Sequence, residues 1–176
     1  GEASSPRGEA APALTEGYWT APLEEMRRLP LASEIDELPP RSSERYTTYG
    51  VRFTSWGPYR LFAYYCVPRG DGPFPAIACM PPYGSVTSPA PSWARGRYVT
   101  LSVCVRGTRL SDVPYRAAFP GTFTNDVADP ERYAYRGVVL DCCRAVEFLL
   151  EQHAVDPTRI ALLGDDLGGT LAVLTS

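Results

Sequence analysis

The sequence predicts a single domain of the α/β class, built on a mostly parallel sheet. Two continuous apolar runs, 76–80 and 98–105, are typical of strands that are buried on both faces of such a sheet. A helical pattern follows over about 129–152. A third apolar run, 160–163, then leads into a glycine-rich turn and the start of another helix. At 176 residues the chain is long enough to bury a core, and no repeat or domain boundary divides it.

The sequence patterns that predict the N-terminal elements are weaker than those of the later strands and helix. Residues 1–16 are rich in Ala, Glu, Ser, Gly and Pro, so we expect them to be disordered and the domain to occupy 17–176. Residues 18–29 form a candidate short helix. The runs 46–54 and 59–67 predict a pair of strands joined by a turn.

The long helix has a start signal and an apolar stripe. Asp129 is a favoured cap and Pro130 is favoured at the first helical position, so the helix is predicted to begin there and to reach about Gln152. Apolar residues at spacings of four and three predict its buried face. That face consists of Tyr135, Val139, Cys142, Val146 and Leu149.

The turn Gly164-Asp-Asp-Leu-Gly168 has the layout of a nucleophile elbow, the sharp turn from a strand to a helix that exposes a nucleophile. Such a turn needs glycine on both sides, because a side chain there would strike the neighbouring backbone. Strands followed by a strand–helix–strand unit and an elbow are the front half of an α/β-hydrolase fold. Asp166 occupies the position at which that fold usually carries serine.

The remainder of a catalytic triad does not follow the elbow. In this fold the nucleophile is followed by an acid and then by a histidine. Only ten residues follow Asp166, and the one histidine, His153, precedes it and is expected to be a solvated loop residue. The strand at Ile160 would also form a bare apolar edge, which proteins normally avoid. We therefore expect a piece of a longer chain or half of a split protein, rather than an independent small fold.

Composition excludes several classes of function. A net charge of −3 gives no reason to expect nucleic acid or an anionic membrane as a partner. No apolar run approaches the roughly 20 residues of a membrane span. The five cysteines form no C-x-x-C pair, so buried reduced thiols in a cytoplasmic protein are expected rather than a metal site or disulfides. The elbow is not a phosphate loop because no Gly-Lys-Ser/Thr follows it, and no cofactor is expected.

Several segments carry a family resemblance. They are Pro75–Gly84, Arg106–Thr108, Pro120–Thr124, Asp129–Arg136, Leu140–Asp141, Arg144–Phe148 and Val155–Ile160. Together they resemble the acetyl xylan esterase/cephalosporin C deacetylase family, from about Tyr18 to the end and over roughly the first half of a member. The resemblance implies a serine esterase that removes acetyl groups from short xylo-oligosaccharides and cephalosporin-type esters, often as a ring-shaped hexamer.

Residue by residue, the resemblance places Asp166 at the nucleophile position. It places the backbone N–H groups of Tyr83 and Leu167 at the oxyanion-hole positions. The resemblance further implies a small ester or acetylated sugar as ligand, and a homo-oligomer or the remainder of a longer chain as partner. The departures lie in the site, because Pro81-Pro82 replaces the family's His-Gly and Thr108-Arg109 replaces the Gln-Gly of its Arg-Gly-Gln-Gly pattern.

Three interpretations of Asp166 remain open. A carboxylate that attacks an acetyl ester gives a mixed anhydride, and alkoxide is a poor leaving group from that adduct, so esterase activity is doubtful. Displacement of a leaving group at saturated carbon suits an aspartate better. That reaction needs Trp or Tyr side chains that donate hydrogen bonds to the leaving group, and Trp93 is a candidate by residue type. The third is a degenerate site that serves binding or assembly. Asp165 favours it, because two adjacent carboxylates buried together disfavour each other's ionised form.

Three polar residues outside the elbow have expected roles. Arg106 follows a strand and is expected to tie loops together by hydrogen bonds. Asp112 and Asp126 are candidate supporting polar groups, although loops are rich in aspartate in any case.

Overall fold

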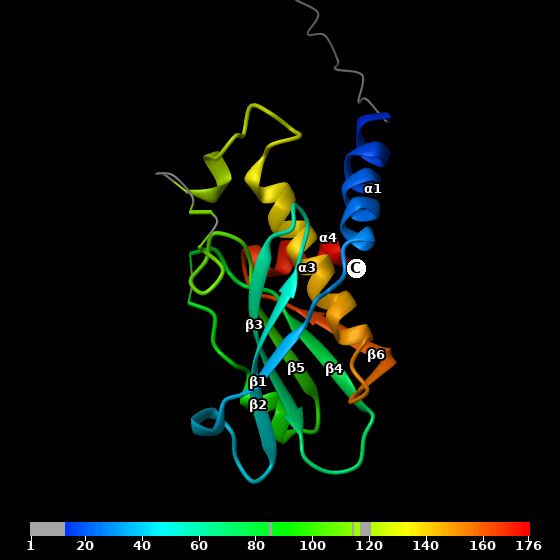
Figure 1. The fold of residues 1–176 in the computed structure, drawn as a ribbon, viewed down its shortest axis with the longest axis vertical. Coiled ribbons are helices and arrows are strands. Elements are labelled where there is room, and N and C mark those ends of the chain that lie inside the picture. Colours follow the sequence, from blue (N-terminus) through cyan, green and yellow to red (C-terminus); the bar gives the residue numbers. More distant parts are fainter. Residues whose placement is uncertain (1–12, 85, 114, 117–120) are drawn as a thin grey trace, which may run out of the picture.

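The computed structural model describes residues 13–84, 86–113, 115–116 and 121–176 (Figure 1). Its helices are α1 (Ala13–Arg28), α2 (Pro91–Arg95), α3 (Ala134–Leu150) and α4 (Leu167–Thr175), with short 3-10 turns at Pro39–Arg41 and Thr122–Thr124. Its strands are β1 (Glu34–Glu37), β2 (Tyr46–Thr54), β3 (Arg60–Pro68), β4 (Phe74–Cys79), β5 (Val99–Cys104) and β6 (Val155–Leu163).

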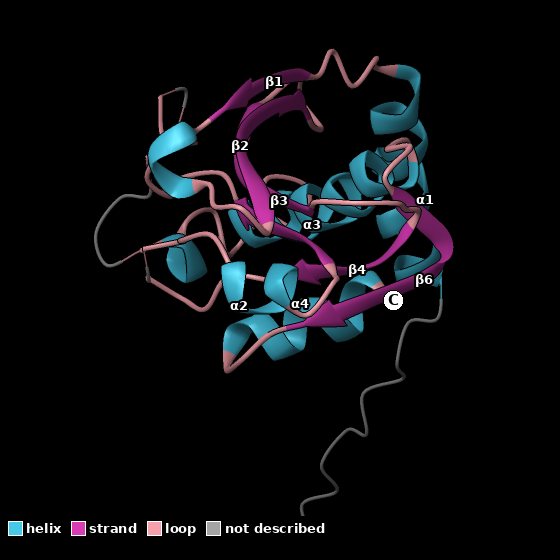
Figure 2. Ribbon diagram, turned by 90° about the horizontal axis from the view of Figure 1, so that it is seen from below, coloured by secondary structure: helices cyan, strands magenta, loops and turns pink. Residues whose placement is uncertain are grey.

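The six strands form one mixed sheet in the order β1-β2-β3-β5-β4-β6. The strands β1, β2, β3 and β5 pair antiparallel in succession, while β4 is parallel to both β5 and β6. Figure 2 shows β4 and β6 running side by side at one end of the twisted sheet and β1 at the other. The predicted apolar runs are therefore the parallel strands, and the run at Ile160 forms the edge strand β6.

Both faces of the sheet are covered by helices. The main core includes Phe53 and Tyr65 of the sheet, which pack against Phe148 of α3 with ring centroids 5.2 and 5.5 Å away. A smaller cluster contains Cys66 and Ala94 of α2. Because neighbouring residues of a strand point to opposite faces, Tyr65 and Cys66 place α3 and α2 on opposite sides of the sheet.

Three predicted boundaries were wrong. The helix predicted over 18–29 begins at Ala13, while residues 1–12 of the segment expected to be disordered lie outside the described residues. The long helix begins at Ala134 rather than Asp129, because the Asp129 carboxylate accepts the N–H groups of Glu131 and Arg132 and so stabilises a separate turn. The last strand begins at Val155, five residues before Ile160.

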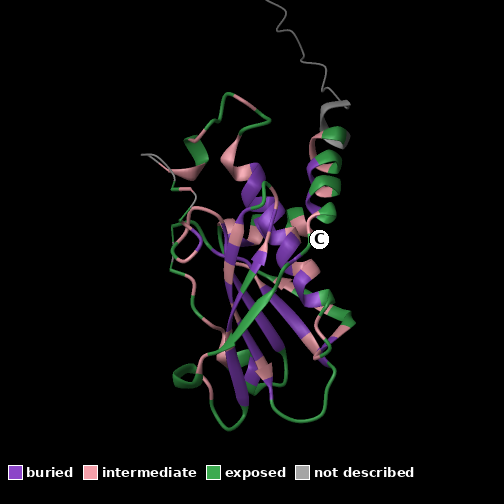
Figure 3. Ribbon diagram, viewed as in Figure 1, coloured by how far each residue is buried: buried purple, intermediate pink, exposed green. Residues whose placement is uncertain are grey.

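Helix α3 is buried over more of its surface than the apolar stripe predicted (Figure 3). Val139, Cys142 and Leu149 are buried as expected, whereas Tyr135 and Val146 are only half-buried. Two buried arginines account for part of the additional buried surface of α3. Arg136 donates to the carbonyl of Tyr18, and Arg144 donates to the carbonyls of Thr54 and Leu29. A helix packed between the sheet and other helices buries polar residues once these are hydrogen-bonded.

Candidate active site

The elbow has the backbone that the glycine pattern predicted. Asp166 lies between β6 and α4 with φ 53° and ψ −121°, which is the positive-φ conformation expected at this turn. A Cβ on Gly164 would lie 2.2 Å from the backbone of Gly168. A Cβ on Gly168 would lie 2.7 Å from the carbonyl oxygen of Met80. Both glycines are therefore required, and the second one lets the elbow approach the end of β4.

A pocket of about 320 Å³ opens at the carboxyl ends of the parallel strands. Its walls come from 81–84 after β4, from 105–109 after β5, and from Leu167 and Leu171 of α4. Ligands of open α/β sheets bind at this edge because loops from neighbouring strands converge there. The structure therefore brings Tyr83 and Leu167 together on one pocket. That their N–H groups share one oxygen remains a prediction.

Asp166 is exposed and is not among the residues that line the pocket. Asp165 is exposed as well. The two carboxylates are therefore not buried together, and their adjacency does not favour a degenerate site, contrary to the expectation from the sequence. Asp166 therefore presents a solvated carboxylate beside the pocket.

Two tyrosines, Tyr83 and Tyr135, line the pocket, and Phe123 contacts both. Tyr83 stacks on Phe123 with ring centroids 4.7 Å apart, and Phe123 contacts Tyr135 of α3 at 5.3 Å. The Tyr135 hydroxyl is buried and has no hydrogen-bond partner among the described residues. Burial raises the pKa of this phenol, so it stays protonated at neutral pH and can donate a hydrogen bond.

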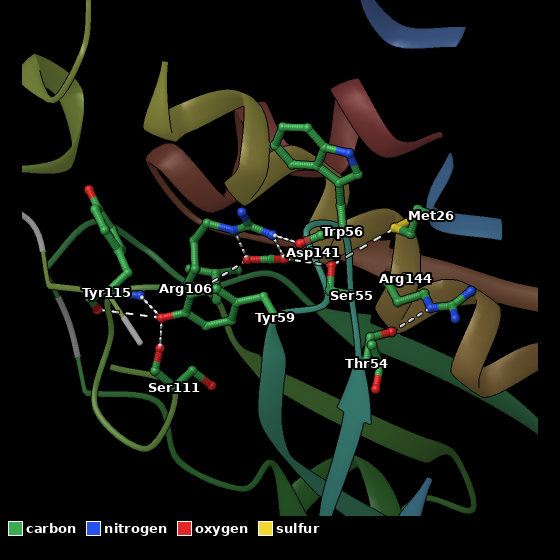
Figure 4. Close-up of polar contacts among 12 residues, drawn as sticks. Met26, Thr54, Ser55, Trp56, Tyr59, Arg106, Ser111, Tyr115, Asp141 and Arg144 are labelled. Atoms are coloured by element: carbon green, nitrogen blue, oxygen red, sulfur yellow. Dashed lines mark hydrogen bonds and ion pairs between the residues drawn. The ribbon is translucent and has the colours of Figure 1, made fainter. Parts of the chain in front are cut away.

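Arg106 lines the pocket, and Figure 4 shows the polar contacts that hold its side chain. Its Nε lies 2.9 Å from Oδ2 of Asp141 and its Nη2 lies 2.8 Å from Oδ1. Ser55 donates to the same carboxylate at 2.6 Å, and Arg106 also donates to the carbonyl of Trp56 at 3.0 Å. The expectation that Arg106 ties loops together is confirmed.

Sequence reasoning missed several supporting residues. Asp141 could have been found as the one carboxylate within the most apolar stretch of α3. The Tyr59 hydroxyl donates to the carbonyl of Ser111 at 2.5 Å, and the Ser111 hydroxyl accepts the N–H of Phe62 at 2.8 Å. These bonds fix the loop after β5 to β3, and no local sequence pattern indicates them.

Other candidate residues lie away from the pocket. His153 is exposed at the far end of β6, a strand of nine residues that spans about 30 Å. Trp93 lies in α2 against Tyr98 and does not line the pocket, so it is not a donor there. Asp112 pairs with Arg116 at 3.3 Å, and Asp126 is 4.0 Å from Arg132. Neither aspartate supports the elbow through an interaction seen in the described residues.

The five cysteines are all free. Burial raises the pKa of Cys79 and that of Cys104 to about 11, so neither thiol is an activated nucleophile. In the part of the chain that the structure covers, no group of three or more His, Cys, Asp or Glu residues is arranged to hold a metal ion. None of the described helices combines the length and apolarity needed to cross a membrane.

A mixed sheet with parallel strands that lead into an elbow beside a pocket defines the α/β-hydrolase class. The sequence matches the acetyl xylan esterase (AXE1) family over residues 6–176, and the chain belongs to that family.

Relatives agree with this assignment. The chain is 22% identical over 173 residues to "Acetyl esterase Axe7A" of Xylanibacter ruminicola. Its fold is similar to that of acetyl xylan esterase 1 from Thermoanaerobacterium sp., with a TM-score of 0.83 over 93% of this chain at 22% identity. It is also similar to the acetyl xylan esterase from Paenibacillus sp. R4, with a TM-score of 0.79 over 90% of this chain at 25% identity.

The chain spans only part of these relatives. It covers 54% and 53% of the two solved esterases and 39% of the curated acetyl esterase. The matched region contains the elbow and the walls of the pocket described above.

Proposed function

We propose that this chain supplies the elbow and ligand pocket of an acetyl xylan esterase-like protein in which Asp166 impairs ester hydrolysis. The observation that carries the proposal is the positive-φ backbone of Asp166, between β6 and α4, at the position where the fold presents its nucleophile. This backbone supports the proposal, in which the Asp166 side chain stands where the fold usually carries serine.

The chemistry of a carboxylate explains the impairment. Attack by Asp166 on an acetyl carbonyl forms a tetrahedral adduct, which must expel the sugar alkoxide to give a mixed anhydride. The carboxylate is a much better leaving group than the alkoxide, so the adduct returns to substrate. Productive collapse needs a general acid to protonate the leaving oxygen. His153 lies at the far end of β6, so it is not positioned to supply that proton.

The proposed ligand is a small acetyl ester or an acetylated sugar. A pocket of about 320 Å³ is at the lower end of the range for small-molecule sites. Tyr83 and Tyr135 line it and offer aromatic surface to a sugar ring. We propose that the protein functions as a homo-oligomer or as part of a longer chain.

The experiment uses the complete protein with p-nitrophenyl acetate as substrate. The native protein should turn over far more slowly than an ordinary esterase, for which about 1–10³ per second is typical. The Asp166→Ser variant tests whether the nucleophile is the missing part, alone and combined with Leu167→Gln, which together give the Ser-Gln of the resembled family's Gly-Gly-Ser-Gln-Gly-Gly turn. Asp165→Ser is the matched control, because it removes an equally exposed carboxylate one residue away.

The outcomes separate the interpretations of Asp166. A large gain with Asp166→Ser and none with Asp165→Ser would mean that the remaining catalytic groups are intact. No gain with either would favour a binding or assembly role. Native turnover at an ordinary esterase rate would overturn the proposal of impaired hydrolysis.

Displacement at saturated carbon is the second candidate, and the exposed carboxylate at the elbow favours it. In this reaction an Asp166 oxygen attacks carbon, the carbon–halogen bond breaks, and halide leaves with the electron pair. Incubation of the complete protein with a short bromoalkane should then release bromide and add the mass of one alkyl group, located at Asp166 by peptide mass spectrometry. Absence of both the adduct and released bromide would exclude this reaction for that substrate.

A further inference from the structure

Two arginines line the pocket, and only one has a carboxylate partner. Arg106 is held by Asp141, which neutralises its charge. Arg109 also lines the pocket and is exposed. In the described part of the chain no carboxylate lies within 4.0 Å of its guanidinium. Arg109 is therefore the one uncompensated charge among the residues that line the pocket.

The backbone on both sides of Arg109 is anchored. The N–H of Thr108 donates to the carbonyl of Val105 at 3.1 Å, and its hydroxyl donates to the same carbonyl at 2.6 Å. Beyond Arg109, the N–H of Ser111 donates to the carbonyl of Thr108 at 2.9 Å. These bonds close a tight turn around Arg109, so its Cα position beside the pocket is fixed although its side chain is solvated.

The other lining residues define what a ligand would meet next to this charge. Apart from Arg106, they are apolar or neutral. The lining contains no acidic residue that would repel an anion. Arginine binds carboxylates through two parallel hydrogen bonds, which gives it geometric selectivity as well as charge.

We propose that Arg109 makes this pocket selective for acidic ligands, namely sugar acids and their acetyl esters, over neutral sugars of the same size. This rests on the proposed function, because it names the ligand class of the same pocket. Tyr83 and Tyr135 pack against the sugar ring, while the Arg109 guanidinium pairs with the carboxylate. Asp166 lies beside the pocket, so this pairing also offsets the repulsion between an acidic ligand and the elbow.

The test compares D-glucuronate with D-glucose, which differ at C6, where a carboxylate replaces the hydroxymethyl group. Dissociation constants are measured by NMR titration of the complete protein at pH 7 and low salt. We expect glucuronate to bind about fivefold more tightly, the upper range for a solvated ion pair. Arg109→Gln should abolish this preference by weakening the binding of glucuronate. Raising the salt to 0.5 M should shrink the preference in the native protein, because ions screen an exposed pair.

Arg116→Gln is the matched control, since it removes the same charge from an exposed residue of the same loop that does not line the pocket. It should keep the preference for glucuronate. Equal affinity for the two sugars, or a preference that survives in Arg109→Gln, would overturn the inference while leaving the proposed pocket intact. If neither sugar bound, the sugar-ligand part of the proposed function would fail as well. The Asp166→Ser experiment would still test the elbow independently.

Discussion

Arg106 and Asp141 form a bidentate ion pair that joins the loop after β5 to the middle of α3. The Asp141 side chain is fully buried and that of Arg106 is 11% exposed. Burial opposes the charge on Arg106, but Asp141 outweighs it and the pKa of Arg106 lies above its ordinary value. Gly137 makes the approach possible, because a Cβ there would lie 2.5 Å from the guanidinium. The base of the pocket therefore depends on one residue pair and one glycine.

Asp141→Asn should destabilise the protein strongly. The change leaves the Arg106 charge without a partner in a largely buried position, and breaking a buried pair in this way costs about 3–5 kcal/mol. Urea unfolding followed by circular dichroism measures the loss. Glu34→Gln is the control, because Glu34 and its partner Arg60 are both accessible to solvent. A similar small loss for both variants would contradict the assignment of Asp141 as the main anchor.

Gly168→Ala should lower the melting temperature and distort the elbow. The added methyl would lie 2.7 Å from the Met80 carbonyl oxygen, so α4 or the end of β4 must shift. Gly17→Ala is the matched control, since a Cβ there meets nothing within 4 Å and alanine favours a helix more than glycine does. The control should be neutral or slightly stabilising. An unchanged melting temperature for Gly168→Ala would contradict the close approach of Gly168 to the Met80 carbonyl oxygen.

Asp156 should titrate at unusually low pH. Its pKa is lowered to about 2, first by the hydrogen bond from the Thr158 side chain and then by that from Arg159. Because the pKa in the folded state is below the unfolded value of about 3.9, the stabilisation is complete above about pH 4 and is lost as the pH falls towards 2. Carbon-13 NMR of the carboxyl group measures the midpoint. Thr158→Val should raise it, and a native midpoint near 4 would refute the prediction.

Cys79 and Cys104 should resist alkylation in the folded protein. With pKa values of about 11, only about one thiol in a thousand is ionised at pH 8. Iodoacetamide labelling with peptide mass spectrometry should therefore show little modification at these positions in native conditions. A urea-unfolded sample, in which burial is removed, should react readily at both. Rapid native labelling of either cysteine would show that the thiols are not desolvated.

The elbow could be predicted from sequence because its requirements are local. Gly164 and Gly168 are needed by the turn itself, and the apolar run before them indicates a buried strand. The strands β2, β3, β4 and β5 were likewise located from short apolar runs. In each case the residues that determine the structure are neighbours along the chain.

The supports of the pocket could not be predicted, because they depend on contacts between distant segments. Asp141 and Ser55 are 86 residues apart, and each lies in an otherwise ordinary local sequence. The predicted start of α3 failed for a related reason. Asp129 has the side chain of a helix cap, but it stabilises a separate turn before the helix. The path of the chain between Asp129 and Ala134 decides whether such a residue caps the helix or the turn. The short strand β1 is entirely exposed and has no apolar pattern to reveal it.

The edge strand β6 has a practical consequence for handling the protein. Its last residue, Leu163, is 41% exposed, and Val173 and Leu174 of the following helix α4 are 74% and 45% exposed. An unpaired strand edge with apolar neighbours offers another molecule both free backbone hydrogen-bonding groups and an exposed hydrophobic surface. A preparation of residues 1–176 alone should therefore self-associate as its concentration rises, with light scattering that depends on dilution. A charged substitution at Val173 should improve the solubility of this preparation and leave the pocket unchanged, because Val173 does not line it.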